Sequence, residues 1–410
     1  AGAWCGQNKY LSAIKNAFQN FMPLTIAGAI GVLWCNVLVN DQTGLGLFFK
    51  PIMALDFLNP AFQAVNFCTI SCITVGITLG IAQEIGVWNM GAERAGYIPG
   101  LVGLAAWLSV TNTSHMVEGA KEAFTGIAGN ELGATGLFTG MIIGVLSVEL
   151  FCFFEKQDAL KIKMPEQVPP GVARAFEVLV PATITLIITA CIGSACYNLT
   201  GLYLNDVIKN GIQGPLGAVG ATIPGVMIIY LVIMLFWLVG IHGNNMLSAV
   251  KEALFTPLAL ENVEKFNKGE KPTNIINMYF LQMCGEFGGS GVTIGLVIAI
   301  MIFGKREDNK AIATLSLVPG LFNINETVTF GIPMVLNPIL GIPFVFACLV
   351  TILVGYVLTV IGFCPVACLT VPWTTPPIVF GFLACGANVM GAVTQAILIV
   401  VSTVIYVPFL

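Results

Sequence analysis

The chain has 410 residues, of which 57% are hydrophobic and only 9% are charged, and its formal net charge is −4. Because soluble domains carry roughly 25% charged residues, this composition excludes an ordinary soluble protein and indicates a chain that crosses a bilayer many times. No run of Lys and Arg is long enough to indicate a nucleic-acid partner.

Apolar runs close to the length that crosses a bilayer, about 20 residues, follow one another along the chain. An amphipathic stretch at 10–20 precedes the first run. The predicted spans are 21–39, 61–83, 96–110, 135–154, 176–197, 216–240, part of 275–303, 343–363 and 391–410. The segment 370–390 is also apolar, but it carries three prolines, so it is either a further span or a broken one.

The distribution of Lys and Arg predicts an interruption in the second half of the chain. Basic loops of multi-pass proteins face the cytoplasm, and alternation of the early spans places Arg94 and the basic residues at 156–174 on that side. In the second half, two basic groups are both typical of cytoplasmic loops: Lys251, Lys265, Lys268 and Lys271, and then Lys305, Arg306 and Lys310. Only one clear span separates them, so we expect a broken or re-entrant segment between them. Non-helical backbone survives at membrane depth only where it is buried in protein or lines a transport site.

Two polar segments in this half are candidates for contact with a substrate. Residues 240–245, GIHGNN, end the sixth predicted span and supply the imidazole of His242 with the amides of Asn244 and Asn245. Residues 285–291, GEFGGSG, form a flexible turn that includes Gly289 and Ser290. The alternative interpretations are an interfacial helix end for the first segment and a plain turn at a helix start for the second.

A third polar segment, 316–337, alternates Pro and Gly with Asn323, Asn325 and Glu326, and Glu326 is the last charged residue of the chain. Burial of an ionised carboxylate is costly unless the group is hydrogen-bonded, paired or protonated. An acid inside a membrane is therefore a candidate functional residue. The hydroxyl groups of a sugar would supply the donors that Glu326 needs; the alternative is a structural pair with another helix.

Six motifs together resemble one family of membrane proteins. They are KMPEQVPPGVARAFEVLVPA (163–182), GIHGNN (240–245), EFGGSGVTIGL (286–296), SLVPGLFNINE (316–326), FGIPMVLNPILGIPF (330–344) and VPWTTPP (371–377). In this order they resemble the lactose/cellobiose/diacetylchitobiose group of phosphotransferase-system EIIC permeases, and the likeness extends over nearly the whole chain.

The resemblance implies an all-α polytopic membrane protein with about ten transmembrane helices, two re-entrant hairpins and amphipathic interfacial helices. It implies a homodimer in the bacterial plasma membrane, with a scaffold and dimerisation domain at 1–210 and a sugar-binding transport domain at 211–410. The catalytic residues of the family match His242 and Glu326, which would hold the hydroxyls of the sugar ring to be phosphorylated. The family usually has Pro after the motif Glu and this chain has Thr327, so either the local backbone differs or the change is tolerated.

The function implied by the resemblance is group translocation of a β-linked disaccharide. The sugar would move inward and present its 6-hydroxyl to a phosphocysteine on a cytoplasmic EIIB subunit, with EIIA and the general phosphocarrier proteins as further partners. We expect the chain to carry no phosphoryl group, cofactor or metal of its own. Its contribution would be to position the sugar and to orient or accept the proton of the attacking hydroxyl. Trp373 would either stack on a pyranose face or belong to an interfacial aromatic belt.

Two other functional classes are considered. An ion-coupled sugar transporter would use Glu326 as a protonation switch and would need no phosphoryl donor. A membrane-embedded hydrolase or transferase would need a nucleophile with a base or a metal cluster, and the sequence has only two His residues and no H-E-x-x-H or G-x-S-x-G motif. The sequence leaves open the inward or outward conformation and the choice among the cellobiose, diacetylchitobiose and lactose classes of sugar.

Overall fold

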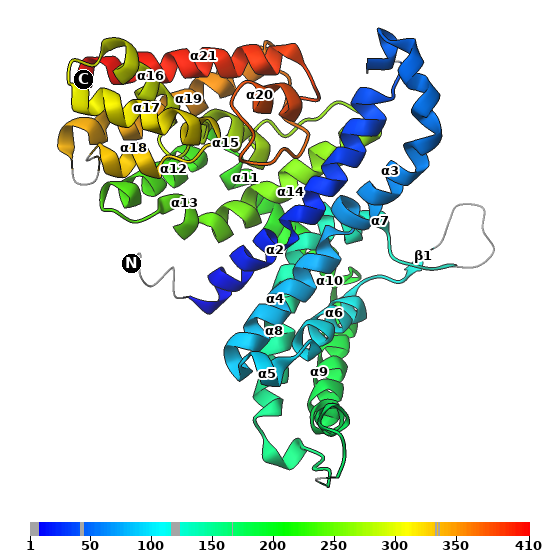
Figure 1. Ribbon diagram of the computed structural model, residues 1–410. Helices are drawn as coiled ribbons and strands as arrows, with labels where there is room; N and C mark the ends of the chain where they lie inside the picture. The colour runs from blue at the N-terminus through cyan, green and yellow to red at the C-terminus, as the bar shows by residue number, and fades with distance from the viewer. Residues whose placement is uncertain (1–7, 42–44, 116–123, 166, 333, 335–336) are drawn as a thin grey trace. The chain divides into compact units, whose positions relative to one another are not determined.

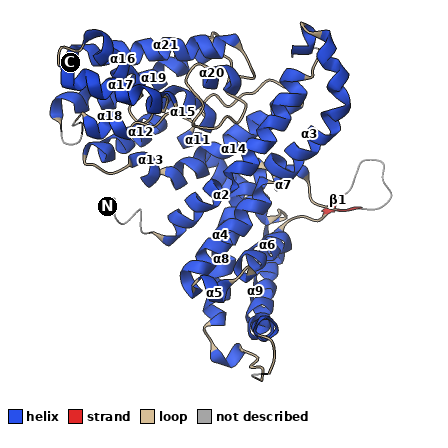
Figure 2. Cartoon of the chain, in the orientation of Figure 1, coloured by secondary structure: helices blue, strands red, loops and turns tan. Residues whose placement is uncertain are grey.

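The computed structural model describes residues 8–41, 45–115, 124–165, 167–332, 334 and 337–410. Three positions of the motif at 330–344 therefore lie outside the described residues. The described chain is almost entirely helical (Figure 2), with one short antiparallel pair of strands, β1 (Ser114–His115) and β2 (Phe124–Thr125). The all-α prediction is confirmed.

The chain folds as two compact units, which we describe separately. The N-terminal unit contains the described residues of 8–24 and 68–216, and the C-terminal unit contains those of 25–67 and 217–410. Helix α2 (Lys9–Leu33) begins in the first unit and ends in the second.

In the N-terminal unit, α4, α6 and α8 pack on one another, and α9 packs on α6 and α8 (Figure 1). The helices are α4 (Ile73–Met90), α5 (Ala92–Ala95), α6 (Ile98–Val110), α7 (Gly129–Leu132), α8 (Ala134–Glu155), α9 (Pro170–Thr200) and α10 (Leu204–Ile208), with shorter turns at Phe67–Ser71, Asp158–Leu160 and Lys209–Gln213. Helix α11 (Gly214–Gly220) begins in this unit and ends in the C-terminal unit. Small residues bring α4 and α8 together: a Cβ atom on Gly140 would lie 2.2 Å from Oγ1 of Thr78. Between helices in lipid the hydrophobic effect gives no driving force, and van der Waals contact at such close backbone approach stabilises their packing instead.

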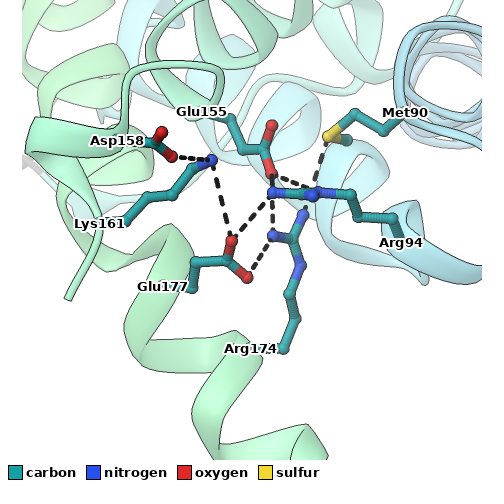
Figure 3. Close-up of polar contacts among 7 residues, drawn as sticks. All are labelled: Met90, Arg94, Glu155, Asp158, Lys161, Arg174 and Glu177. Atoms are coloured by element: carbon teal, nitrogen blue, oxygen red, sulfur yellow. Dashed lines mark hydrogen bonds and ion pairs between the residues drawn. The ribbon is translucent and has the colours of Figure 1, made fainter. Parts of the chain in front are cut away.

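A group of ion pairs joins the ends of α5, α8 and α9 (Figure 3). Glu155 has a side chain only 3% exposed, and its Oε1 atom accepts from Nε of Arg94 at 2.8 Å and from Nη1 of Arg174 at 2.9 Å. Glu177 accepts from the same two guanidinium groups at 2.9 and 2.8 Å, and Lys161 lies 4.0 Å from it. Arg94, Lys161 and Arg174 therefore lie together, as the predicted alternation of spans requires.

In the C-terminal unit, α19 and α21 pack on each other, α12 and α15 pack on α19, and α16 packs on α21. The helices are α3 (Asn59–Asn66), α12 (Ile223–Leu238), α13 (Gly243–Met246), α14 (Ser248–Asn267), α15 (Met278–Gly285), α16 (Ile294–Phe303), α17 (Glu307–Leu321), α18 (Glu326–Gly331), α19 (Pro338–Val360), α20 (Val379–Ala384) and α21 (Val389–Tyr406), with shorter turns at Trp34–Leu38, Leu45–Leu47, Lys50–Leu58 and Val407–Phe409.

Three breaks interrupt the helices of the C-terminal unit. The first break, 286–293, separates α15 from α16 and contains Gly288, Gly289 and Gly291, whose φ angles are 69°, 89° and 79°. The second break, 322–325, separates α17 from α18 and contains Asn323 at φ 63°. The third break, 361–378, precedes the six-residue helix α20. The predicted interruption within 275–303 is present. Of the two interpretations of the segment 370–390, a further span or a broken segment, the structure shows the broken segment.

Five helical segments in the described chain are long and apolar enough to cross a membrane: Lys9–Leu38, Ala134–Glu155, Pro170–Thr200, Ile339–Val360 and Val389–Phe409. A sixth is reached if Lys50–Ser71 and Ile73–Met90 are one bent span, and three shorter apolar helices are Ile98–Val110, Ile223–Leu238 and Ile294–Phe303. The total of about ten spans stays a prediction. Two predicted boundaries differ, because the amphipathic stretch at 10–20 continues into the first span as α2 and the span at 61–83 is interrupted before α4.

Candidate functional site

All nine predicted site residues lie in the C-terminal unit, at its breaks or beside them. His242 precedes α13, which carries Asn244 and Asn245; Gly289 and Ser290 lie in the first break, Asn323 and Asn325 in the second, and Trp373 in the third, while Glu326 begins α18. Hydrogen bonds link these segments, so residues predicted from separate motifs form one connected group.

His242 and Glu326 face each other at the centre of the candidate site. Their Nε2 and Oε1 atoms lie 3.9 Å apart, and their side chains are 37% and 47% exposed. That separation exceeds hydrogen-bond length, and a hydroxyl oxygen set to one side of the line joining the two atoms could lie about 2.8 Å from both. The His242 ring also lies 4.4 Å from the Trp237 ring, between centroids.

The hydrogen bonds of His242 determine where its proton resides. Its Nδ1 atom accepts the backbone N–H of Asn245 at 3.2 Å and so caps α13. Burial lowers the pKa of His242 from 6.5, while the nearby carboxylate of Glu326 opposes that shift. A neutral imidazole that accepts at Nδ1 carries its proton on Nε2, which directs an N–H donor at the carboxylate of Glu326.

A buried ion pair beside this site was not predicted from the sequence. Glu286, in the first break, pairs through Oε1 with Nζ of Lys251 and accepts from the hydroxyl of Tyr230 at 2.7 Å. Lys251 lies in α14 with a side chain only 7% exposed. Lys251 was counted with the lysines of a loop, but it lies in a helix and is buried, because a loop count treats every lysine as solvated; its cytoplasmic side stays a prediction. The available signal was Glu286 itself, an acid in an apolar stretch that needs a countercharge.

Amide side chains connect the first two breaks and α13. The Nδ2 atom of Asn244 donates to Oγ of Ser290 at 2.8 Å, and its Oδ1 atom accepts from Lys251 at 3.1 Å. Asn325 is 4% exposed, and its Nδ2 atom donates to the backbone carbonyl of Ser290 at 2.8 Å. Gly289 permits this approach, because a Cβ atom there would lie 2.6 Å from Cβ of Asn325.

Asn323 connects all three breaks through its side-chain amide. Its Oδ1 atom accepts from the backbone N–H of Gly288 at 2.6 Å, and its Nδ2 atom donates to the backbone carbonyls of Trp373 and Thr375, the latter at 3.1 Å. The side chains of Asn323 and Asn325 thus bind protein groups in this structure. Asn245 and Trp373 keep exposed side chains, so they are better placed to meet a substrate directly.

The fold and the site together define a class of protein: a multi-pass helical membrane protein with polar residues gathered where its helices are broken, as in transporters. Comparison with known proteins gives the family. The chain belongs to the phosphotransferase system EIIC family, whose model matches residues 15–348.

Individual proteins of this family are similar along almost the whole chain. The oligo-beta-mannoside-specific EIIC component of Bacillus subtilis (strain 168) is 34% identical, over 98% of this chain and 89% of that protein. The cellobiose-specific EIIC component of Lactococcus lactis subsp. lactis (strain IL1403) is 29% identical, over 98% of this chain and 94% of that protein. The crystal structure of the transporter ChbC, the IIC component from the N,N'-diacetylchitobiose-specific phosphotransferase system, matches with a TM-score of 0.90 and 29% identity, over 99% of this chain and 94% of that chain.

These findings identify the chain as a sugar permease of the β-glycoside group of EIIC components and as a multi-pass protein of the bacterial plasma membrane. EIIC components work in the membrane with a sugar and with EIIB. The comparisons do not favour the ion-coupled alternative.

Proposed function

We propose that this permease binds a β-linked disaccharide of the cellobiose, diacetylchitobiose or lactose class, moves it inward and presents its 6-hydroxyl to a phosphorylated EIIB. The observation that carries the proposal is the facing pair of His242 and Glu326, set 3.9 Å apart and both partly exposed. A donor and an acceptor at that separation suit a hydroxyl, which both accepts and donates a hydrogen bond.

In the proposed site, the 6-hydroxyl oxygen accepts the Nε2–H of His242 and donates its own proton to the carboxylate of Glu326. During transfer, that oxygen forms a bond to phosphorus while the bond from phosphorus to the EIIB cysteine sulfur breaks. The hydroxyl proton passes to Glu326, and the thiolate leaves with EIIB. The permease thus supplies general-base assistance and a fixed geometry, while its partner supplies the phosphoryl group.

The sugars named for the similar proteins support the substrate class. Oligo-β-mannoside, cellobiose and diacetylchitobiose are named for three of them, and lactose is named for a Staphylococcus aureus (strain COL) EIICB component that is 32% identical over 98% of this chain and 69% of that protein. All are β-linked pyranosides. We infer that Trp373, which is 45% exposed, stacks on a pyranose face.

We further propose a homodimer in which residues 1–210 serve as scaffold and dimer contact and residues 211–410 carry the sugar. The two compact units divide the chain near this boundary, between 216 and 217, and also group residues 25–67 with the C-terminal part. Crosslinking of the full chain in its membrane, analysed for dimers, tests the assembly.

The product of transport tests the proposed function. Right-side-out vesicles would carry the full chain in the membrane and would be loaded with EIIB, EIIA, the general phosphocarrier proteins and phosphoenolpyruvate as the phosphoryl donor. They would receive a panel of labelled β-linked disaccharides from outside. We expect the transported sugar to be recovered as its 6-phosphate, and its uptake to persist when an uncoupler is added. Recovery of unmodified sugar, with uptake that collapses under the uncoupler, would overturn the proposal in favour of ion coupling.

A further inference from the structure

Lys251 and Glu286 form a buried ion pair that the proposed reaction does not use. Lys251 lies on α14 and Glu286 at the start of the first break, and their side chains are 7% and 18% exposed. Tyr230, from α12, donates its hydroxyl to the same Oε1 atom of Glu286 at 2.7 Å. Side chains from two helices, α12 and α14, therefore converge on one carboxylate oxygen of the first break, beside the candidate sugar site.

The pair also determines how the amide of Asn244 is turned. Lys251 has only donors, so its 3.1 Å contact must be made to the oxygen of that amide. The Nδ2 group of Asn244 then points at Ser290 and donates to Oγ at 2.8 Å. Because Oγ of Ser290 accepts this bond, the hydroxyl proton of Ser290 is free to donate to another group.

Stability alone gives no reason to keep such a pair. Replacing a buried ion pair by well-packed neutral groups is often neutral or stabilising, whereas removing one partner leaves an uncompensated charge. A role in orientation explains why a lysine stands in α14 at this position. Without its ammonium group, the Asn244 amide has no fixed preference between its two orientations, and one of them would present oxygen instead of N–H to Ser290.

We propose that Lys251 and Glu286 are positioning residues: they fix the Asn244 amide, and through it the donor direction of Ser290, in the orientation that receives the disaccharide. The proposal rests on the proposed function, because it assigns these residues to the same sugar site.

A set of variants of the full chain, purified in detergent, separates positioning from stability. Lys251→Met and Glu286→Gln, made singly, leave one buried group without its partner, and we expect each to lower Tm. The double variant carries neither charge, so we expect its Tm to return close to that of the wild type while its sugar Kd stays about tenfold weaker. The double variant Glu307→Gln with Lys310→Met removes an exposed pair in the same unit, with side chains 86% and 38% exposed, and should change neither quantity.

A double-mutant cycle with Asn244 supplies the decisive readout. If the ion pair acts through Asn244, the Lys251→Met and Glu286→Gln changes will weaken sugar binding in the wild-type background but add little in an Asn244→Ala background. Equal losses in both backgrounds, or full recovery of affinity in the charge-free double variant, would overturn the positioning role. A wild-type chain that binds no β-linked disaccharide would overturn the proposed function and this proposal together, whereas sugar binding without coupling to Asn244 overturns only the positioning role.

Discussion

The Oε1 atom of Glu326, the first residue of α18, lies 3.9 Å from the Nε2 atom of His242, whose Nδ1 atom caps α13. One imidazole therefore performs two tasks: one nitrogen holds the backbone and the other faces the carboxylate. Glu326 takes the first position of α18 and Thr327 the second, a position that Pro99 occupies in α6 and Pro224 in α12, so the absence of the family's Pro does not by itself alter the start of this helix. The two-sided use of His242 makes its roles separable by substitution.

His242→Asn and His242→Gln should fail in opposite ways. The Asn amide oxygen can replace Nδ1 as a cap for α13, but no donor then reaches toward Glu326; we expect near-normal Tm and weakened sugar binding. The longer Gln amide can reach toward Glu326, but it then no longer accepts the N–H that caps α13. Loss of that cap should lower the free energy of unfolding by about 0.5–2 kcal/mol. Thermal melts and direct sugar titration of both variants check this, and a reversed pattern would contradict the assigned tautomer.

The pH dependence of sugar binding follows from the lowered pKa of His242. Because the pKa of His242 is lowered from 6.5, more than half of the imidazole stays neutral at pH 6.5, and affinity should change little from neutral pH down to that value. Below it, protonation turns Nδ1 into a donor that cannot accept from Asn245, and both binding and this residue's contribution to stability should fall. Sugar titrations across this range should show the fall in wild type and lose this component in His242→Asn. An equal fall in the variant would assign the titration to another group.

Gly288 combines a positive φ angle with a close main-chain contact, and Gly269, which has a similar φ angle but no close contact, allows the two effects to be separated. A Cβ atom on Gly288 would lie 2.4 Å from the backbone nitrogen of Ile294, at φ 69°, whereas Gly269 has a similar φ of 72° with nothing within 4 Å. Gly269→Ala should cost about 1–2 kcal/mol from backbone strain alone. Gly288→Ala adds a clash with main chain and should also displace the first break, so sugar binding should fall with Tm. Equal effects in the two variants would show that the clash is relieved without moving the site.

The sequence pattern located the first two breaks but left 370–390 open as a span or a broken segment. The excess of Gly, Pro and Asn in 285–291 and 316–337, with one clear span between two basic groups, predicted non-helical backbone in this half. Glu326 was identifiable as an acid in apolar surroundings, and the family resemblance implied its pairing with His242.

The partners of individual side chains were not predictable. Nothing in the sequence distinguishes Lys251 from the other lysines of 251–271, and only the packed structure shows its ion pair with Glu286. Asn323 was predicted to contact sugar, but its amide binds backbone groups of Gly288, Trp373 and Thr375. An amide serves a substrate or a distant carbonyl equally well, and the choice depends on how segments remote in sequence fold together.

The central claim is that Glu326 binds a hydroxyl of the sugar, and direct binding to the Glu326→Gln variant tests it most simply. The substitution keeps the shape of the side chain and removes its charge, so affinity for a β-linked disaccharide should weaken by about 1–3 kcal/mol, the scale of a hydrogen bond to a charged group. Glu307→Gln, on a side chain 86% exposed, is the matched control and should bind as wild type does. Calorimetry on folded protein that finds unchanged affinity in Glu326→Gln would contradict the account.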